Sequence, residues 1–240
     1  MCTASWLHQK SGYTLFFNRD ELRTRQIARS PEIFEKNGVQ FIAPIDSDAG
    51  GSWIGVNEFG LSLCLLNYYH SDFQPDPQKK YISRGLLLLS LLDSKNQEAI
   101  LQRLQQVAFA NYNSFILGIF APEKPVIAAI WGGTGNVLKF KKNLPPPLSS
   151  SSFDSLAVIA GRKQLYRENI SANGEPAPAM LASYHKSHLP NAGPYSVCMH
   201  REDAHTVSFS QITVDHQTIE FKYTPGSPCK TEFSDTKMIK

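Results

Sequence analysis

The chain has few cysteines, and their spacing does not suggest a shared site. Its 240 residues include only four, Cys2, Cys64, Cys198 and Cys229, with no CxxC pair among them. Zinc ribbons and small disulfide-stabilised domains place several cysteines at short, repeated spacings. The sequence therefore predicts neither a structural metal nor a disulfide framework, and we expect no resident cofactor.

Long apolar runs and blocks of like charge are also missing. The most apolar stretch, GLLLLSLL at 85–92, is too short to cross a bilayer, and polar residues interrupt the N-terminal stretch where a signal peptide would have its apolar core. The formal net charge is +3, and the basic residues are scattered except for Lys139, Lys141 and Lys142. We expect no membrane insertion, no nucleic-acid partner and a cytoplasmic location.

Short β-branched and aromatic runs bounded by turn residues dominate the first part of the chain. They predict strands at 13–17, 39–42, 52–56 and 61–66, and the Ser11-Gly12 turn pairs the first of these with the N-terminal TASWL in a hairpin. Helical spacing of apolar residues follows at 83–92 and 96–108, and Asp93 or Ser94 is the expected cap of the second helix.

The second part of the chain repeats the strand pattern. Strands are predicted at 115–120, 126–131, 137–140, 156–159, 195–200, 206–214 and 219–223, with a helix at 177–186. The Pro/Ser-rich stretch 143–152 is expected to be a surface loop. Two blocks of strands with grouped helices predict an α+β fold of two packed sheets covered by helices, as one domain over 1–240.

Cys2 follows the initiator methionine directly, which raises the question of nucleophilic chemistry. A thiolate is the reactive form, and a thiol needs a base to take its proton. If Met1 is removed, the free α-amine of Cys2 has a reference pKa of roughly 7.7–8.0 and can serve as that base. The alternative is an inert terminal thiol.

Three further residues could assist such a nucleophile. The predicted hairpin brings Asp20 near Cys2, where its carboxylate could hold the amine, while Arg19 could steady the thiolate or a substrate anion. Asn67 ends the strand in LSLCLLNYY and could donate to an oxyanion, although an asparagine at a strand end is often only a turn former.

Together these stretches resemble the NRDE family, also called the transport and Golgi organisation protein 2 family. The resemblance rests on MCT at the start, FFNRDE at 16–21, DAGGSWIGVNEFGLSLCLLNYY at 48–69 and SVCMHREDAHTVSFSQI at 196–212. The family is similar to N-terminal-nucleophile hydrolases, among them choloylglycine hydrolases, penicillin V acylases and acyl-CoA-dependent acyltransferases. It implies a four-layer αββα sandwich.

The resemblance also implies site residues. Cys2 would be the nucleophile, Asp20 would hold its amine, Asn67 would supply the oxyanion hole, Arg19 would lie nearby, and a late arginine would map to Arg201. Asn18, Glu21, Gly50, Gly51 and Trp53 are candidates for substrate binding, although Gly50, Gly51 and Trp53 also fit a turn followed by a core aromatic. The relatives carry a second asparagine after a mid-chain strand, and Gly161 and Arg162 stand there in this sequence.

Several polar residues remain open to two interpretations. The seven histidines are expected to be surface or core residues. His185 and His188 are three apart and would share a face if both lay on one helix, and Cys198-Met199-His200 is also suggestive of a haem ligand set. The Arg162, Lys163 and Arg167 group is either a solvated helix face or a site for the phosphates of a CoA ester.

Two functions from different classes follow. The first is an N-terminal-cysteine amidohydrolase or acyltransferase acting on a small amide or thioester. The second is a non-enzymatic haem- or acyl-CoA-binding protein, since the family is linked to haem trafficking and to acyl-CoA or lipid homeostasis. An enzyme of this type requires a free amine on Cys2, whereas a carrier does not.

Overall fold

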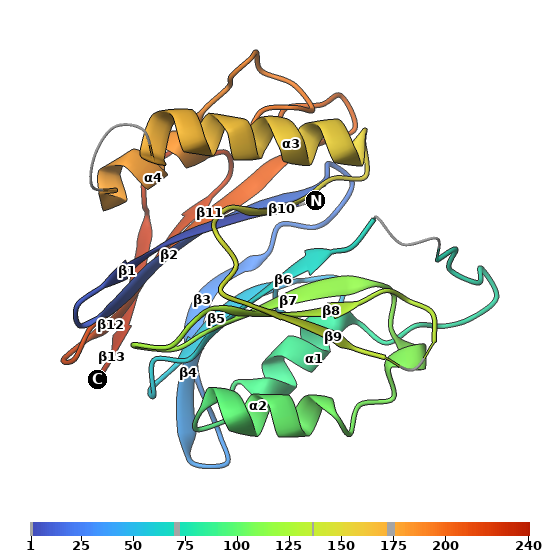
Figure 1. The fold of residues 1–240 in the computed structure, drawn as a ribbon, viewed down its shortest axis with the longest axis vertical. Coiled ribbons are helices and arrows are strands. Elements are labelled where there is room, and N and C mark those ends of the chain that lie inside the picture. Colours follow the sequence, from blue (N-terminus) through green and yellow to red (C-terminus); the bar gives the residue numbers. More distant parts are fainter. Residues whose placement is uncertain (1, 70–72, 136, 172–175) are drawn as a thin grey trace.

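Two antiparallel sheets lie face to face in the computed structural model, with helices on both outer sides (Figure 1). The structure describes residues 2–69, 73–135, 137–171 and 176–240. Helices α3 and α4 cover one sheet, while α1 and α2 cover the other (Figure 1). The four layers form an αββα sandwich, as the sequence predicts.

Strands from both ends of the chain build the first sheet. Its order is β10-β1-β2-β11-β12-β13. The bounds are β1 (Cys2–Gln9), β2 (Gly12–Leu22), β10 (Leu148–Ser150), β11 (Ala204–Val214), β12 (Ile219–Pro225) and β13 (Asp235–Ile239). The β1–β2 hairpin pairs Cys2 with Arg19, which confirms the predicted hairpin.

The second sheet is a meander in sequence order, β3-β4-β5-β6-β7-β8-β9. Its bounds are β3 (Arg29–Lys36), β4 (Val39–Ile45), β5 (Ile54–Asn57), β6 (Ser62–Asn67), β7 (Phe115–Phe120), β8 (Ile127–Trp131) and β9 (Lys139–Lys142). In β6 and β7, Asn67 pairs with Phe115, so that the end of β6 lies beside the start of β7.

The helices are short. They are α1 (Arg84–Leu91), α2 (Gln97–Leu104), a 3₁₀ turn (Phe109–Asn111), α3 (Ser155–Tyr166) continued by a π turn (Arg167–Ser171), and α4 (Pro178–Lys186). Asn96 caps α2 by accepting a hydrogen bond from the Ala99 amide, so the expected caps Asp93 and Ser94 were wrong. The second helix also ends earlier than predicted.

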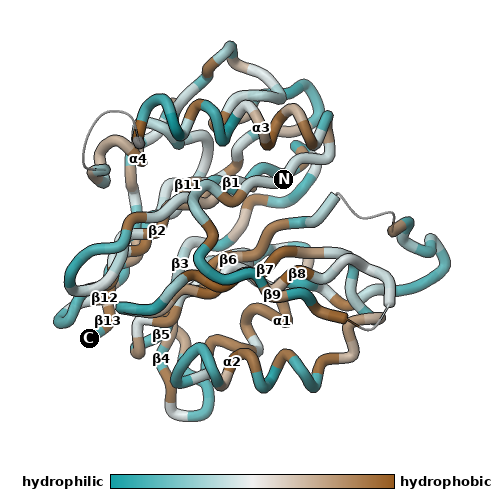
Figure 2. Tube along the Cα trace, in the orientation of Figure 1, coloured by the Kyte–Doolittle hydropathy of each residue, from teal (hydrophilic) through white to brown (hydrophobic). Residues whose placement is uncertain are grey.

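Alternation along the strands separates the apolar cores. Tyr13, Leu15 and Phe17 of β2 face the second sheet, whereas Phe16 faces α3 and α4, because successive strand residues point to opposite faces. A further core joins the outer face of the second sheet to α1 and α2. Hydrophobic stretches accordingly run through the strands of both sheets, whereas hydrophobic and hydrophilic positions alternate along α2 and α3 (Figure 2).

Two predicted strands were wrong. Residues 156–159 belong to α3, in which Val158, Arg162 and Tyr166 are buried at a helical spacing of four, while Leu156 is 74% exposed. Residues 195–200 form a loop whose backbone bonds to the preceding segment, as when the Cys198 amide donates to the Ser187 carbonyl. The expected loop at 143–152 contains β10, and β3 and β13 were not predicted.

No helix in the described ranges is long and apolar enough to span a membrane.

Candidate functional site

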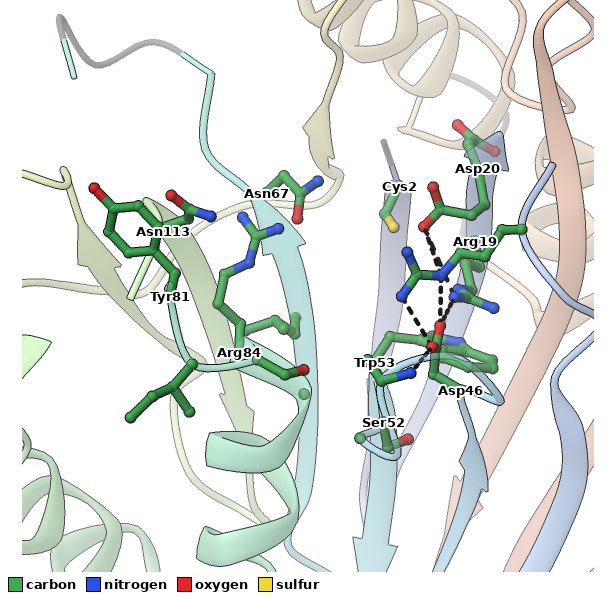
Figure 3. A pocket seen from close by; sticks show the side chains of 18 residues that line it. Cys2, Arg19, Asp20, Asp46, Ser52, Trp53, Asn67, Tyr81, Arg84 and Asn113 are labelled. Carbon is green, nitrogen blue, oxygen red and sulfur yellow. Dashed lines mark hydrogen bonds and ion pairs between the residues drawn. The ribbon is translucent and has the colours of Figure 1, made fainter. Parts of the chain in front are cut away.

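A pocket of about 270 Å³ opens between the two sheets at the end where β1 begins and β6 ends (Figure 3). Cys2, Arg19 and Asp20 line it from the first sheet, and Asn67 lines it from the second. Glu21, Gly51 and Trp53 line it as well. The structure therefore places these seven sequence-proposed residues around one cavity.

Cys2 lies on the wall formed by the first sheet. Its side chain is buried, on the face of β1 that meets the second sheet. Burial raises the pKa of the Cys2 thiol to about 11, and the carboxylate of Asp20 also raises it, while Arg19 and a hydrogen bond from the Asp20 backbone lower it. A thiol in this state needs a base before it can act as a nucleophile.

Asp20 follows Arg19 on β2 and is fully enclosed. Its Oδ1 accepts a hydrogen bond from Thr206 Oγ1 at 2.7 Å, and its Oδ2 lies 3.6 Å from Nη1 of Arg162, whose side chain is also completely buried. An ion pair between two buried side chains is costly to break, since the remaining charge would lack a partner. The position of Asp20 therefore depends on α3.

Arg162, on α3, contacts Asp20, and the sequence did not predict this contact. Its guanidinium donates to Thr3 Oγ1 at 2.7 Å, to the Ser196 carbonyl at 2.7 Å and to Ser149 Oγ at 3.3 Å. The expectation of a solvated face holds only for its neighbours Lys163 and Arg167, which are exposed. The four-residue spacing of Val158, Arg162 and Tyr166 could have indicated a helix with Arg162 on its buried face. Assigning 156–159 to a strand excluded that interpretation.

Arg19 is held by carboxylates and by an aromatic ring. Its Nη2 bonds to Asp46 and lies 3.7 Å from Glu21 Oε2, and its guanidinium carbon lies 3.9 Å from the centre of the Trp53 ring. The Asp46 carboxylate also accepts two hydrogen bonds from Arg25, from Nε to Oδ2 at 2.8 Å and from Nη2 to Oδ1 at 2.9 Å. These contacts fix Arg19 in one orientation beside Cys2.

Asp46 was not recognised from the sequence, although it organises this wall. Burial favours a raised pKa for Asp46, but hydrogen bonds from Arg25 and the Ala49 amide, with the charges of Arg19 and Arg25, lower the pKa overall. Its backbone also bonds to Gly50 and Gly51. The carboxylate thus links the DAGG turn to both arginines.

The opposite wall carries amides and a cation (Figure 3). Asn67 ends β6, and its Nδ2 donates one hydrogen bond to the Tyr69 hydroxyl at 2.7 Å. Asn113 lies just before β7 and also lines the pocket, with a buried Oδ1 that has no hydrogen-bond partner in the described part of the chain. Pairing of β6 with β7 brings these two amides to the same end of the sheet.

The second asparagine expected from the resemblance has no counterpart at Gly161 and Arg162. That stretch lies within α3 rather than at a strand end. Asn113 instead provides a second side-chain amide to the pocket, from the loop just before β7, the strand that pairs with β6. Its place just before the predicted strand at 115–120 was the signal that could have found it.

Arg84, at the start of α1, adds a positive charge to the same wall. It is partly buried, and burial lowers its pKa. Its Nη1 donates to the Ser114 carbonyl at 2.8 Å, and within the described ranges no carboxylate forms an ion pair with it. Its charge is therefore available to a ligand in the pocket.

Close backbone contact between Gly51 and Gly85 places α1 at the pocket. A Cβ on Gly51 would lie 2.5 Å from the Gly85 carbonyl carbon, and a Cβ on Gly85 would lie 2.8 Å from the backbone of Ser52. The Ser52 amide donates to the Gly85 carbonyl at 3.2 Å. Gly51 thus has a structural reason to be glycine, because it allows α1 to approach the turn.

Three proposed site residues lie outside the pocket lining. Asn18 points to the helical side of β2, where its amide donates to the carbonyls of His185 and Val197 at 2.9 and 3.0 Å. Gly50 has φ +65° in the DAGG turn. Arg201 pairs with Asp203 at 2.7 Å and lies over Phe153. Strand alternation explains Asn18, since it faces away from Arg19.

His185 is a core residue. Its ring is fully buried between Ser5 Oγ at 2.8 Å and Asn18 Oδ1 at 3.0 Å, and burial lowers its pKa to about 3. His188 lies beyond the end of α4 and is exposed, so the two histidines do not share a helix face.

The family profile "Transport and Golgi organisation 2" matches residues 1–155. The chain belongs to this family. The match contains Cys2, the NRDE stretch, the DAGGSWIG turn, Asn67 and Asn113. A comparison with curated proteins gives no significant match.

Solved structures with a similar fold are N-terminal-nucleophile hydrolases. The chain matches an N-acylethanolamine-hydrolyzing acid amidase ortholog from Caenorhabditis elegans with a TM-score of 0.60 and 9% identity, over 88% of this chain and 92% of that one. Penicillin V acylase from Agrobacterium tumefaciens matches with a TM-score of 0.55 and 11% identity, over 94% of this chain and 83% of that one. A mutant of conjugated bile acid hydrolase from Clostridium perfringens matches with a TM-score of 0.52 and 16% identity, over 100% of this chain and 97% of that one. These similarities establish the predicted fold.

Proposed function

We propose that this protein is an N-terminal-cysteine amidohydrolase or acyltransferase that acts on a small amide or thioester, after Met1 has been removed. The observation that carries the proposal is the arrangement of one pocket, in which Cys2 lies beside Arg19 and Asp20 and across from the amides of Asn67 and Asn113. A nucleophile, an orienting carboxylate and opposed amide donors are the groups that acyl transfer requires.

In the proposed mechanism, the α-amine of Cys2 takes the thiol proton, and the thiolate attacks the substrate carbonyl carbon. Asn67, with Asn113, donates to the oxyanion of the tetrahedral intermediate. The proton then passes from the ammonium to the leaving amine or thiol as the carbonyl re-forms. Water, or a second acceptor nucleophile, attacks the resulting thioester and releases Cys2.

Asp20 and Arg162 have positioning roles in this scheme. Asp20 would orient the amine at the start of β1, and Arg162 holds Asp20 through the buried ion pair. Because a base must lie within hydrogen-bond reach of its proton, a displaced amine would slow proton transfer more than it would weaken substrate binding.

The charge of the pocket favours a substrate with an anionic group. Arg19 and Arg25 already pair with Asp46 and Glu21, whereas Arg84 has its hydrogen bond to a neutral carbonyl. We therefore propose that Arg84 binds a carboxylate or phosphate on the part of the substrate that does not react.

The alternative function is binding of haem or an acyl-CoA ester without chemistry. The same pocket favours it in two respects. Arg84, which forms no ion pair with a carboxylate of the described residues, suits an anionic ligand, and burial disfavours the Cys2 thiolate. The two functions differ in what Cys2 does, so the state of this residue separates them.

The decisive experiment is intact-mass analysis of the protein from its native host, before and after incubation with acyl-CoA thioesters and N-acyl amides. The proposal predicts loss of Met1 and a transient acyl adduct that is absent in Cys2→Ala. The matched control is Cys64→Ala, which removes another buried thiol and should keep the adduct.

Retention of Met1, or no adduct and no hydrolysis with any member of the panel, would contradict the enzymatic proposal. Stoichiometric binding of haem or acyl-CoA that is equal in the native protein and in Cys2→Ala would then establish the carrier function.

A further inference from the structure

Two cysteines and two histidines from separate parts of the chain meet at one point outside the pocket. They are His188, Cys198, His200 and Cys229, and one ligand atom from each lies within 4.8 Å of all the others. None of them lines the pocket that contains Cys2. Their side chains are graded in burial, from the buried Cys198 to the exposed His188.

Three distances within this Cys₂His₂ cluster, all from His200, match those of a tetrahedral metal site. Nε2 of His200 lies 3.5 Å from Sγ of Cys198, 3.5 Å from Sγ of Cys229 and 3.2 Å from Nε2 of His188. A tetrahedral zinc ion with Zn–S of about 2.3 Å and Zn–N of about 2.05 Å would separate sulfur from nitrogen by about 3.5 Å and nitrogen from nitrogen by about 3.3 Å.

The orientation of the imidazoles agrees with shared coordination. The rings of His188 and His200 cross at 77° and approach each other through their Nε2 atoms rather than by stacking face to face. Thiols are weak hydrogen-bond donors and acceptors, so mutual hydrogen bonds give little reason to gather these four side chains. Thiolate and imidazole in a tetrahedral S₂N₂ set are the ligands that zinc prefers.

The cluster joins two segments that lie outside the regular helices and strands. His188, Cys198 and His200 lie in the connection between α4 and β11, and Cys229 lies in the turn after β12. Long connections without secondary structure of their own are uncommon in compact domains and are usually functional. A metal ion bound by all four side chains would hold the two segments together.

The cluster is connected to the wall that carries Asp20. The amide of Met199, between Cys198 and His200, donates to Thr206 Oγ1 at 2.8 Å, and this hydroxyl donates to Asp20 Oδ1 at 2.7 Å. Fixing Cys198 and His200 therefore fixes the segment that orients Thr206 toward Asp20.

We infer that His188, Cys198, His200 and Cys229 form a structural zinc site. Both cysteines bind as thiolates, so that uptake of the ion releases their two protons. All four ligands come from the protein, which closes the coordination sphere and makes the role structural rather than catalytic. The inference does not depend on the proposed enzymatic function, because it concerns a different set of residues.

Metal analysis of the full-length protein, purified in zinc-containing medium without chelators, tests the site directly. We expect about one zinc per chain, as for a single closed site. Replacement of zinc by Co²⁺ should give thiolate-to-cobalt absorption and the visible bands of tetrahedral cobalt.

Variants assign the ligands. Cys229→Ser and His188→Ala alter partly or fully exposed side chains, so the fold should survive, as circular dichroism would verify. Each should weaken zinc binding by at least about tenfold, since even residues that only support metal ligands have effects of this size. The matched controls are Cys64→Ala and the exposed His216→Ala, which should retain zinc.

Three results would overturn the inference. They are zinc far below one per chain with no thiolate absorption from added Co²⁺, zinc binding that is unchanged in both Cys229→Ser and His188→Ala, and a Cys198–Cys229 disulfide in the freshly purified protein.

Discussion

The two walls of the pocket differ in how their polar groups are paired. On the first sheet, Arg19 bonds to Asp46 and Asp20 lies against Arg162, so that cations and carboxylates neutralise each other. On the opposite wall, Arg84 at the start of α1 donates to a neutral carbonyl, and Asn113 before β7 has a buried Oδ1 without a hydrogen-bond partner in the described ranges. The charges of the first wall are therefore neutralised within the protein, whereas the second wall has a cation left for a ligand.

This difference suggests a division of labour. Paired, buried charges hold side chains in one geometry, which is what a nucleophile and its supporting groups need. A cation without a carboxylate partner, such as Arg84, gains most from a substrate that supplies an anionic acceptor. The first wall is thus suited to hold the reactive group, and the second wall is suited to recognise the carbonyl and an anionic group.

The largest effect is expected at Cys2. Cys2→Ala should reduce turnover by at least about 10³-fold, because the nucleophile and its bond to the acyl group are lost. Cys2→Ser should also lose most turnover, since an alkoxide is much harder to form than a thiolate. Rates on the acyl-CoA and N-acyl amide panel, with thermal unfolding as a check of the fold, measure this. Wild-type rates in Cys2→Ala would remove Cys2 from the mechanism.

Breaking the buried ion pair of the first wall should destabilise the fold. Arg162→Met removes the buried cation beside Asp20, and we expect a loss of about 3–5 kcal/mol in the free energy of unfolding. Chemical denaturation measures it, with the exposed neighbour Lys163→Met as the control. The double variant with Asp20→Asn should lose less than the sum of the two single losses. Strict additivity would show that the two residues do not interact.

On the second wall, Asn67→Ala should lower kcat by about 10² to 10³, the usual loss for one oxyanion donor. Asn113→Ala should have a similar effect if both amides face the oxyanion. The substrate KM should change little in either variant, because the hydrogen bond strengthens only in the transition state. A rise in KM at constant kcat would instead indicate that the amide only binds the substrate.

Arg84→Met should affect binding rather than chemistry. Loss of a charge-assisted hydrogen bond should raise KM for an anionic substrate by about tenfold and leave a neutral analogue unchanged. Lys80→Met, which removes an exposed positive charge, is the control for general electrostatics. Equal effects on anionic and neutral substrates would contradict the proposed role.

The smallest effect concerns pH and Asp46. Its pKa is lowered in the folded protein, so the ionised carboxylate stabilises the fold above its unfolded value of about 3.9, and this contribution is lost as the pH falls through the lower folded value. Asp46→Asn should therefore reduce stability at neutral pH and flatten the dependence of stability on pH below about 4. Denaturation midpoints between neutral and strongly acidic pH measure this. An unchanged slope would show that Asp46 does not contribute.

Local sequence pattern was sufficient to predict an element where a run of apolar or aromatic residues has a clear turn or length. The aromatic and β-branched run at 13–17, with the Ser11-Gly12 turn before it, predicted the hairpin that sets Cys2 beside Arg19, and the apolar run at 83–92 predicted α1. The same approach failed at 156–159, where four apolar residues fit a strand or a helix equally well. There, contacts from Arg162 to Thr3, Ser149 and Ser196 favour the helix.

Residue identity and order in the sequence thus determined the family, the two-sheet architecture and the candidates Cys2, Asp20 and Asn67, because these depend on short motifs and strand periodicity. Only the tertiary structure decided that Arg162 is buried against Asp20, that Asn113 joins Asn67, and that His188, Cys198, His200 and Cys229 meet. The physical reason is the same in each case. These contacts form between segments far apart in the chain, and sheet register and helix packing, rather than local sequence, set which side chains face one another.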